Sequence, residues 1–154
     1  MSHSRMATPV GTALVMPQAA VQARRFSKAR EARSATVRED YVELIADLVA
    51  REGAARTVDV ARQLGVSHGT VAKTVGRLRR EGLVSGRPYR GLFLTRAGQV
   101  LAERVQARHR LVVELLVAVG VPIKDAEADA EGIEHHVSAS TLKAFSCFLA
   151  ERSD

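Results

Sequence analysis

Apolar residues recur at the 3.6-residue spacing of a helix over most of this chain. Residues 36–53 give the first strong example. There Thr36 and Glu39 match the S/T-x-x-E capping-box pattern, and Gly53 suits a helix end. We therefore expect a helix that starts at Val37. Its predicted apolar positions are Tyr41, Leu44, Ile45, Leu48 and Val49.

Two shorter helical patterns follow and are separated by a tight turn. We expect Thr57 to cap the first helix and Gly65 to end it. We expect Val66 to fill the turn and Ser67 to cap the second helix. Two crossed helices joined in this way form a helix-turn-helix. The predicted inward-facing residues are Val60, Ala61, Leu64, Val71, Val75 and Leu78.

Short apolar runs in residues 83–95 flank a turn rich in Gly, Pro and Arg, which predicts a two-stranded hairpin, the wing of a winged helix. Thr95 is expected to cap a long helix over residues 96–119. Gly120 should end that helix, Pro122 should start the next one, and Ser138 should cap the last one.

The predicted fold class is mainly α with a small β wing. An N-terminal winged helix-turn-helix over residues 36–97 is followed by an all-helical domain over residues 98–154. Residues 1–35 are rich in Ala, Ser, Arg and Gln, and we interpret them as a flexible basic arm that could be helical near residues 18–33.

The C-terminal half carries more apolar surface than one copy of the chain needs, which suggests a homodimer interface. In the last helix this surface comprises Leu142, Phe145, Phe148 and Leu149. The lone Cys147 lies among them, so we expect a half-buried thiol and a reducing compartment, the cytoplasm. No apolar run approaches the roughly 18 residues of a membrane span, and we recognise no secretory signal.

Charge is distributed unevenly, and its distribution points to nucleic acid. Residues 56–98 hold nine Lys or Arg and two Asp or Glu, a formal charge of +7. Such a helix-turn-helix is expected to bind double-stranded DNA, although it could serve instead as a protein-interaction module. The predicted base-contacting residues are Ser67, His68, Gly69, Thr70, Lys73 and Thr74, and the predicted phosphate contacts are Arg77, Arg79, Arg80, Arg87 and Arg90.

A cluster of acidic and imidazole side chains points to a divalent cation. On a helix, Glu131, Glu134 and His135 would share one face. Taken alone, they would be an ordinary solvated face. Candidate partners are Asp40 and Glu43, which could simply complement a helix dipole, and His109, which could be a satisfied core residue. Oxygen ligands with one or two imidazoles suit manganese or ferrous ions.

Several segments resemble the diphtheria toxin repressor family and, within it, the manganese transport regulators. They are DYVE at 40–43, residues 58–78, YRGLFLT at 89–95, RH at 108–109 and DAEGIEHH at 129–136. The resemblance implies a dimeric winged-helix repressor that binds an operator, expected to be palindromic, only when loaded with metal. Such repressors commonly act upstream of metal-uptake genes.

The resemblance also implies a ligand set for a two-metal site in each protomer: Asp40, Glu43, His109, Glu131, Glu134 and His135. Iron-responsive relatives have Met and Cys where Asp40 and Glu131 stand, so hard carboxylates favour Mn(II) here. The chain departs from the family pattern at Val113, which puts a secondary site in doubt, and at His68 and Gly69, which suggests a nonstandard operator. The SH3-like third domain of iron-responsive members is not expected.

Other functions remain open at this point. The chain could be an Fe(II)-responsive regulator of the same family, or a metal-independent winged-helix regulator that senses a small organic ligand. A small metallohydrolase is a further alternative, but the chain lacks an H-E-x-x-H pattern, so we expect no enzymatic activity. We also expect no organic cofactor. His136 is expected to be either a partner of the metal ligands or a core residue.

Overall fold

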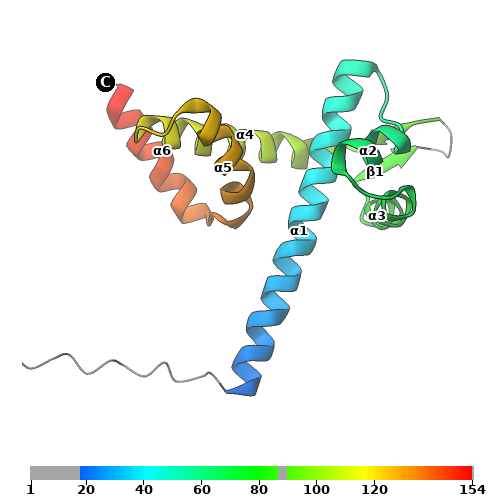
Figure 1. Ribbon diagram of the computed structural model, residues 1–154, viewed down its shortest axis with the longest axis horizontal. Helices are drawn as coiled ribbons and strands as arrows, with labels where there is room; N and C mark the ends of the chain where they lie inside the picture. The colour runs from blue at the N-terminus through cyan, green and yellow to red at the C-terminus, as the bar shows by residue number, and fades with distance from the viewer. Residues whose placement is uncertain (1–17, 87–89, 154) are drawn as a thin grey trace, which may run out of the picture.

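The computed structural model describes residues 18–86 and 90–153, and this part of the chain is mostly helical. Its elements are α1 (Ala19–Glu52), α2 (Thr57–Leu64), α3 (His68–Arg80), β1 (Val84–Gly86), β2 (Leu92–Leu94), α4 (Arg96–Ala118), α5 (Ile123–Ile133), the 3-10 helix η1 (Glu134–His136) and α6 (Ala139–Ser153). Figure 1 shows α2, α3 and the strands on one side of α1, with α5 and α6 on the other and α4 running between. We call the C-terminal part of α1 together with α2, α3 and the strands the winged-helix lobe, and we call α4, α5, η1 and α6 the helical lobe.

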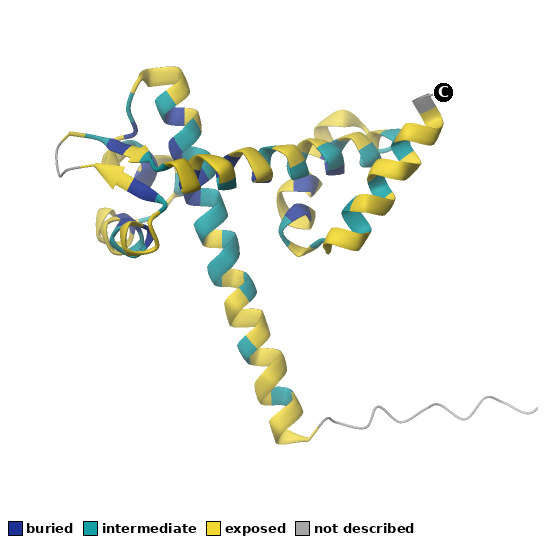
Figure 2. Cartoon of the chain, turned by 180° about the vertical axis from the view of Figure 1, so that it is seen from behind, coloured by how far each residue is buried: buried dark blue, intermediate teal, exposed yellow. Residues whose placement is uncertain are grey.

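Helix α1 is much longer than expected, so the predicted start at Val37 is wrong. Thr36 lies inside the helix, and its hydroxyl donates to the carbonyl of Ala32 at 3.0 Å instead of capping. The preceding segment, residues 19–35, contains no Gly or Pro and is rich in Ala and Arg, so helix propagation continues through it. The helix thus runs through the predicted boundary between arm and DNA-binding domain, and its first half is largely exposed (Figure 2).

The helix-turn-helix is confirmed, with one local correction. Gly65 ends α2 in the left-handed conformation at φ 65°, and Ser67 Oγ accepts from the amide of Thr70 at 3.1 Å, as an N-cap should. Thr57 is the first helical residue of α2 rather than its cap; Arg56 holds the cap position and makes no side-chain capping bond.

The hairpin completes the wing and attaches to the end of α1. Strands β1 and β2 pair antiparallel with Val84 opposite Leu94, and a bridge between Ala55 and Leu92 ties β2 to the segment after α1. The turn at 87–89, including the predicted phosphate contact Arg87, lies outside the described residues. A cluster of buried apolar residues holds this lobe: Tyr41, Ile45, Leu48, Ala55, Val60, Ala61, Val71, Val75, Leu78, Val84 and Leu92.

The helical lobe begins at Thr95, which caps α4 by accepting from the amide of Gly98 at 3.1 Å, as predicted. Ser138 likewise caps α6 through the amide of Thr141 at 3.2 Å. Pro122 stands one residue before α5 rather than at its first position. Cys147 is exposed, which corrects the expected half-buried thiol. Within the described residues, none of the helices combines the length and apolar character needed to cross a membrane.

Candidate functional site

The site forms where the middle of α1 meets the helical lobe. Asp40 and Glu43 lie on α1, and His109 lies on α4. Helix α5 ends at Ile133, so Glu134 and His135 belong to η1 and do not continue the helical face of Glu131 as expected. The tighter turn nevertheless brings these side chains together with those from α1 and α4, as the following contacts show.

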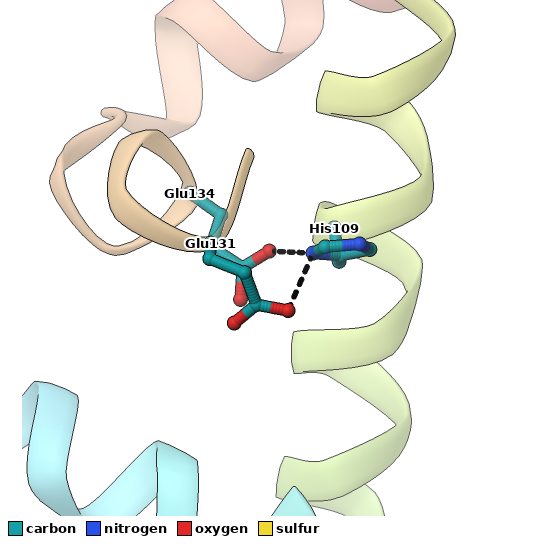
Figure 3. A group of neighbouring side chains, drawn as sticks. All are labelled: His109, Glu131 and Glu134. Carbon is teal, nitrogen blue, oxygen red and sulfur yellow. Dashed lines mark hydrogen bonds and ion pairs between the residues drawn. The ribbon is translucent and has the colours of Figure 1, made fainter. Parts of the chain in front are cut away.

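One group of contacts surrounds His109. Its Nδ1 lies 2.5 Å from Glu134 Oε2 and 3.8 Å from Glu131 Oε1. Figure 3 shows both carboxylates turned toward this ring from the end of α5 and from η1. One ligand atom from each residue fits within 4.8 Å of the others. A carboxylate pair and an imidazole so spaced can share one cation.

A second group of contacts joins η1 to α1. His135 Nε2 lies 3.2 Å from Asp40 Oδ1 and 3.6 Å from Glu134 Oε1. The carboxylate of Glu134 therefore has one oxygen beside His109 and the other beside His135. It connects the two groups into one continuous centre.

Glu43 lines the cavity beside these contacts. The cavity has a volume of about 420 Å³, and its wall includes Asp40, Glu43, Asp47, Gln63, Glu131 and His135. Burial, together with the negative charges of Glu134 and Glu131, raises the pKa of Glu43 to about 7. The predicted six residues are thus all brought to one place, with Glu43 in the wall of the cavity.

The chemistry of this centre fits a divalent cation. Burial also raises the pKa of Asp40 and of Glu134, so ionising these carboxylates without a nearby positive charge is unfavourable. Glu134 is fully buried, and its Oε1 has no hydrogen-bond partner. A buried carboxylate oxygen without a partner is costly unless a cation or donor satisfies it.

Sequence reasoning missed Glu39, which contacts the ring nitrogen of His135 that faces away from Asp40. Its Oε2 accepts from Arg108 Nη2 at 2.5 Å and lies 2.7 Å from His135 Nδ1. This contact leaves His135 Nε2 facing Asp40. The expected capping box had assigned Glu39 to a helix start. A signal was present, because Glu39 and Glu43 stand four positions apart and so share one face of the helix.

The predicted DNA-contacting residues fall into different surroundings. On α3, Val71, Val75 and Leu78 are buried as expected. Five of the six predicted base-contacting residues are exposed: Ser67, His68, Gly69, Thr70 and Lys73. The sixth, Thr74, is partly buried. Arg77 instead turns toward α1, and its Nη1 donates to Ser34 Oγ at 3.3 Å. Its Nε lies 3.7 Å from Glu81 Oε1, at the end of α3. Arg90 is exposed.

His136 is exposed as well. It is therefore not a core residue, which was one of its two expected roles.

Comparisons with known proteins agree with the division of the chain into a winged-helix lobe and a helical lobe. Residues 35–92 match the family model described as the iron dependent repressor N-terminal DNA binding domain. Residues 95–153 match the iron dependent repressor metal binding and dimerisation domain. The transcriptional regulator MntR of Escherichia coli O157:H7 is 49% identical over 80% of this chain and 79% of its own length. The MntR of Salmonella typhimurium is 48% identical over 82% and 80%.

Solved structures give the same fold. The manganese regulator SloR superposes with a TM-score of 0.63 at 31% identity, over 73% of this chain and 53% of SloR. A manganese-dependent transcriptional repressor in complex with manganese gives a TM-score of 0.64 at 28% identity, over 73% and 52%. This chain therefore spans about half the length of those structures. The two family matches and the 49% identity show that the chain belongs to the diphtheria toxin repressor family of iron-dependent repressors, among its manganese transport regulators.

Proposed function

We propose that this chain is a Mn(II)-responsive DNA-binding transcriptional regulator, a repressor of metal-uptake genes that acts in the cytoplasm as a homodimer. The observation that carries the proposal is the convergence of α1 carboxylates with His135 and Glu134 around a buried, unsatisfied oxygen. The names of its relatives, which are transcriptional regulators rather than enzymes, agree with a regulatory role. They do not favour an organic ligand as the signal.

The metal ligands in this proposal are Asp40, Glu43, His109, Glu131, Glu134 and His135, arranged for two metals in each protomer. When bound, the cations supply the positive charge that these carboxylates lack. Four carboxylates, two imidazoles and no sulfur favour Mn(II) over softer metals. Asp40 and Glu43 belong to the helix whose later turns carry core residues of the winged-helix lobe. Bound metal would hold these residues against η1. It would thereby fix the position of the DNA-binding surface relative to the helical lobe, which would form the dimer interface.

The DNA-binding surface in this proposal is the exposed side of α3. Ser67, His68, Gly69, Thr70, Lys73 and Thr74 offer donors and small groups to base edges, and Arg87 and Arg90 would contact phosphates. Arg77 was predicted to contact phosphates too, but its bond to Ser34 favours a role in fixing α1 against α3. A symmetric dimer would present two such surfaces, which favours a palindromic operator.

The proposal is tested by DNA affinity at fixed salt. An operator would first be selected from a pool of random duplexes with the Mn(II)-loaded protein. Its affinity would then be measured with Mn(II), Fe(II), Zn(II) or a chelator. We expect Mn(II) to tighten binding by roughly 5- to 150-fold, the usual range of allosteric coupling. Glu131→Ala and His135→Ala should abolish this response. Equal affinities with Mn(II) and with chelator would contradict the proposal.

A further inference from the structure

A second cavity lies in the winged-helix lobe, away from the metal centre. It has a volume of about 590 Å³ and opens between the start of α2, one flank of α3 and the wing. Buried Val75 and Leu92 form part of its floor. Three exposed arginines line it, one from each neighbouring element: Arg56, Arg79 and Arg90. We call it the three-arginine cleft.

The positive charge of this cleft is not neutralised within the described chain. No acidic residue lines the cleft, and none of its arginine side chains has a hydrogen bond or ion pair with a described residue. The only acidic residues between positions 56 and 98 are Asp59 and Glu81. Asp59 pairs with Arg62 at 2.6 Å, and Glu81 pairs with Arg38 at 3.4 Å. Both carboxylates are therefore engaged by arginines outside the cleft, which leaves it attractive to an anion.

The position of the cleft on α3 indicates which anion this is. Ala72, Val75 and Arg79 line it and follow i, i+3, i+7 spacing, so one flank of α3 faces the wing across the cleft. Lys73, next to Ala72, belongs to the exposed ridge that would enter a major groove. A helix in the major groove has a sugar-phosphate backbone along each flank. One backbone would therefore run between α3 and the wing.

We propose that the three-arginine cleft holds the DNA backbone, with Arg56, Arg79 and Arg90 contacting phosphates from three sides. This inference rests on the proposed function and deepens it, because it adds Arg56 to the phosphate contacts and places Arg56, Arg79 and Arg90 around one segment of the DNA backbone. Charge complementarity selects the occupant, because the cleft offers a strand of phosphates and sugar rings a partly apolar floor and three arginines that have no ion pair with the described residues. Such contacts position the protein on the duplex without reading its sequence.

The test measures affinity for a short duplex of random sequence at several salt concentrations. Each neutralised phosphate contributes about 0.9 to the slope of log affinity against log salt. Arg56→Ala and Arg79→Ala should each lower the magnitude of the slope by about 0.9, and the double variant by about twice that. Arg79→Lys should keep most of the slope. Arg51→Ala is the matched control, because Arg51 is an exposed arginine of the same lobe that does not line the cleft.

The outcomes separate this inference from the proposed function. Random duplex requires neither a known operator nor metal loading, so a failure of the Mn(II) response would contradict only the proposed function. A double variant that folds normally by thermal unfolding and keeps the wild-type slope would overturn the inference. An unchanged slope together with lost binding of inorganic phosphate would also overturn it, by showing that the cleft takes a small anion. Because the arginines are exposed, their replacement should not unfold the lobe.

Discussion

The winged-helix lobe buries a continuous cluster of apolar side chains, whereas the helical lobe buries few large ones. Ile45, Leu48 and Leu78 are fully buried in the first lobe. In the second lobe, α5 and η1 contribute Ala126, Ala130 and the carboxylate of Glu134 to the buried set. Large apolar residues stay exposed there, including Val119 at 60% and Ile123 at 57%.

This difference shows that the two lobes depend on different interactions. The first lobe is stabilised mainly by burial of apolar area, which contributes about 25 cal/mol per Å². The second lobe has clustered carboxylates whose negative charges repel one another, and it has large apolar residues that are exposed to solvent. A cation and a second copy of the chain would satisfy both, in keeping with its match to a metal binding and dimerisation domain.

The largest expected effect comes from the apolar core of the winged-helix lobe. Leu78→Ala should lower the free energy of unfolding of this lobe by about 2 to 5 kcal/mol, because Leu78 is fully buried. Its effect on Mn(II) affinity should be small, since Leu78 does not line the metal centre. Urea denaturation and calorimetric Mn(II) titration would measure both quantities. A parallel loss of Mn(II) affinity would show that the metal centre depends on the apolar core of the winged-helix lobe.

A smaller effect is expected from Glu39, the support of the metal centre. Glu39→Gln should weaken Mn(II) binding by about 10- to 100-fold, the usual consequence of losing a partner that orients a ligand histidine. The reason is the contact between Glu39 and His135 Nδ1 at 2.7 Å, which directs Nε2 toward Asp40. Glu31→Gln, on the exposed part of α1, is the control. Equal Mn(II) affinity in both variants would rule out this role for Glu39.

The smallest effect concerns pH and the metal-free helical lobe. The pKa of Glu43 is raised to about 7 in the folded protein, so the folded state holds this proton more tightly than the unfolded state. Its contribution to stability is complete below the usual glutamate pKa and is lost as pH rises to about 7. Metal-free protein should therefore unfold at lower urea near neutral pH than in weak acid. Glu43→Gln should flatten this dependence, and an unchanged profile would contradict the assignment.

Much of the fold could be predicted because local signals decided it. Ser67, Thr95 and Ser138 each cap a helix as expected. An N-cap hydroxyl accepts a hydrogen bond from a backbone amide in the first turn of its own helix, and this bond does not depend on what the helix packs against. The start of α1 could not be predicted, because the capping box at Thr36 competes with a preceding segment that also favours helix.

The candidate site was only partly predictable for a related reason. Its ligand types were evident from sequence, but their supports were not. Glu39 reaches Arg108 and His135, which are 69 and 96 positions away, and such contacts depend on how α1 crosses α4 and η1. The internal pairing of Arg77 with Ser34 likewise depends on the unexpected first half of α1.

The central claim is that side chains from α1 and from the helical lobe hold the same divalent cations. Anomalous diffraction from crystals grown with Mn(II) tests it most directly. We predict manganese peaks bound by Asp40 or Glu43 on one side and by His109, Glu134 or His135 on the other. Manganese bound elsewhere, or at only one of these two sides, would contradict the account.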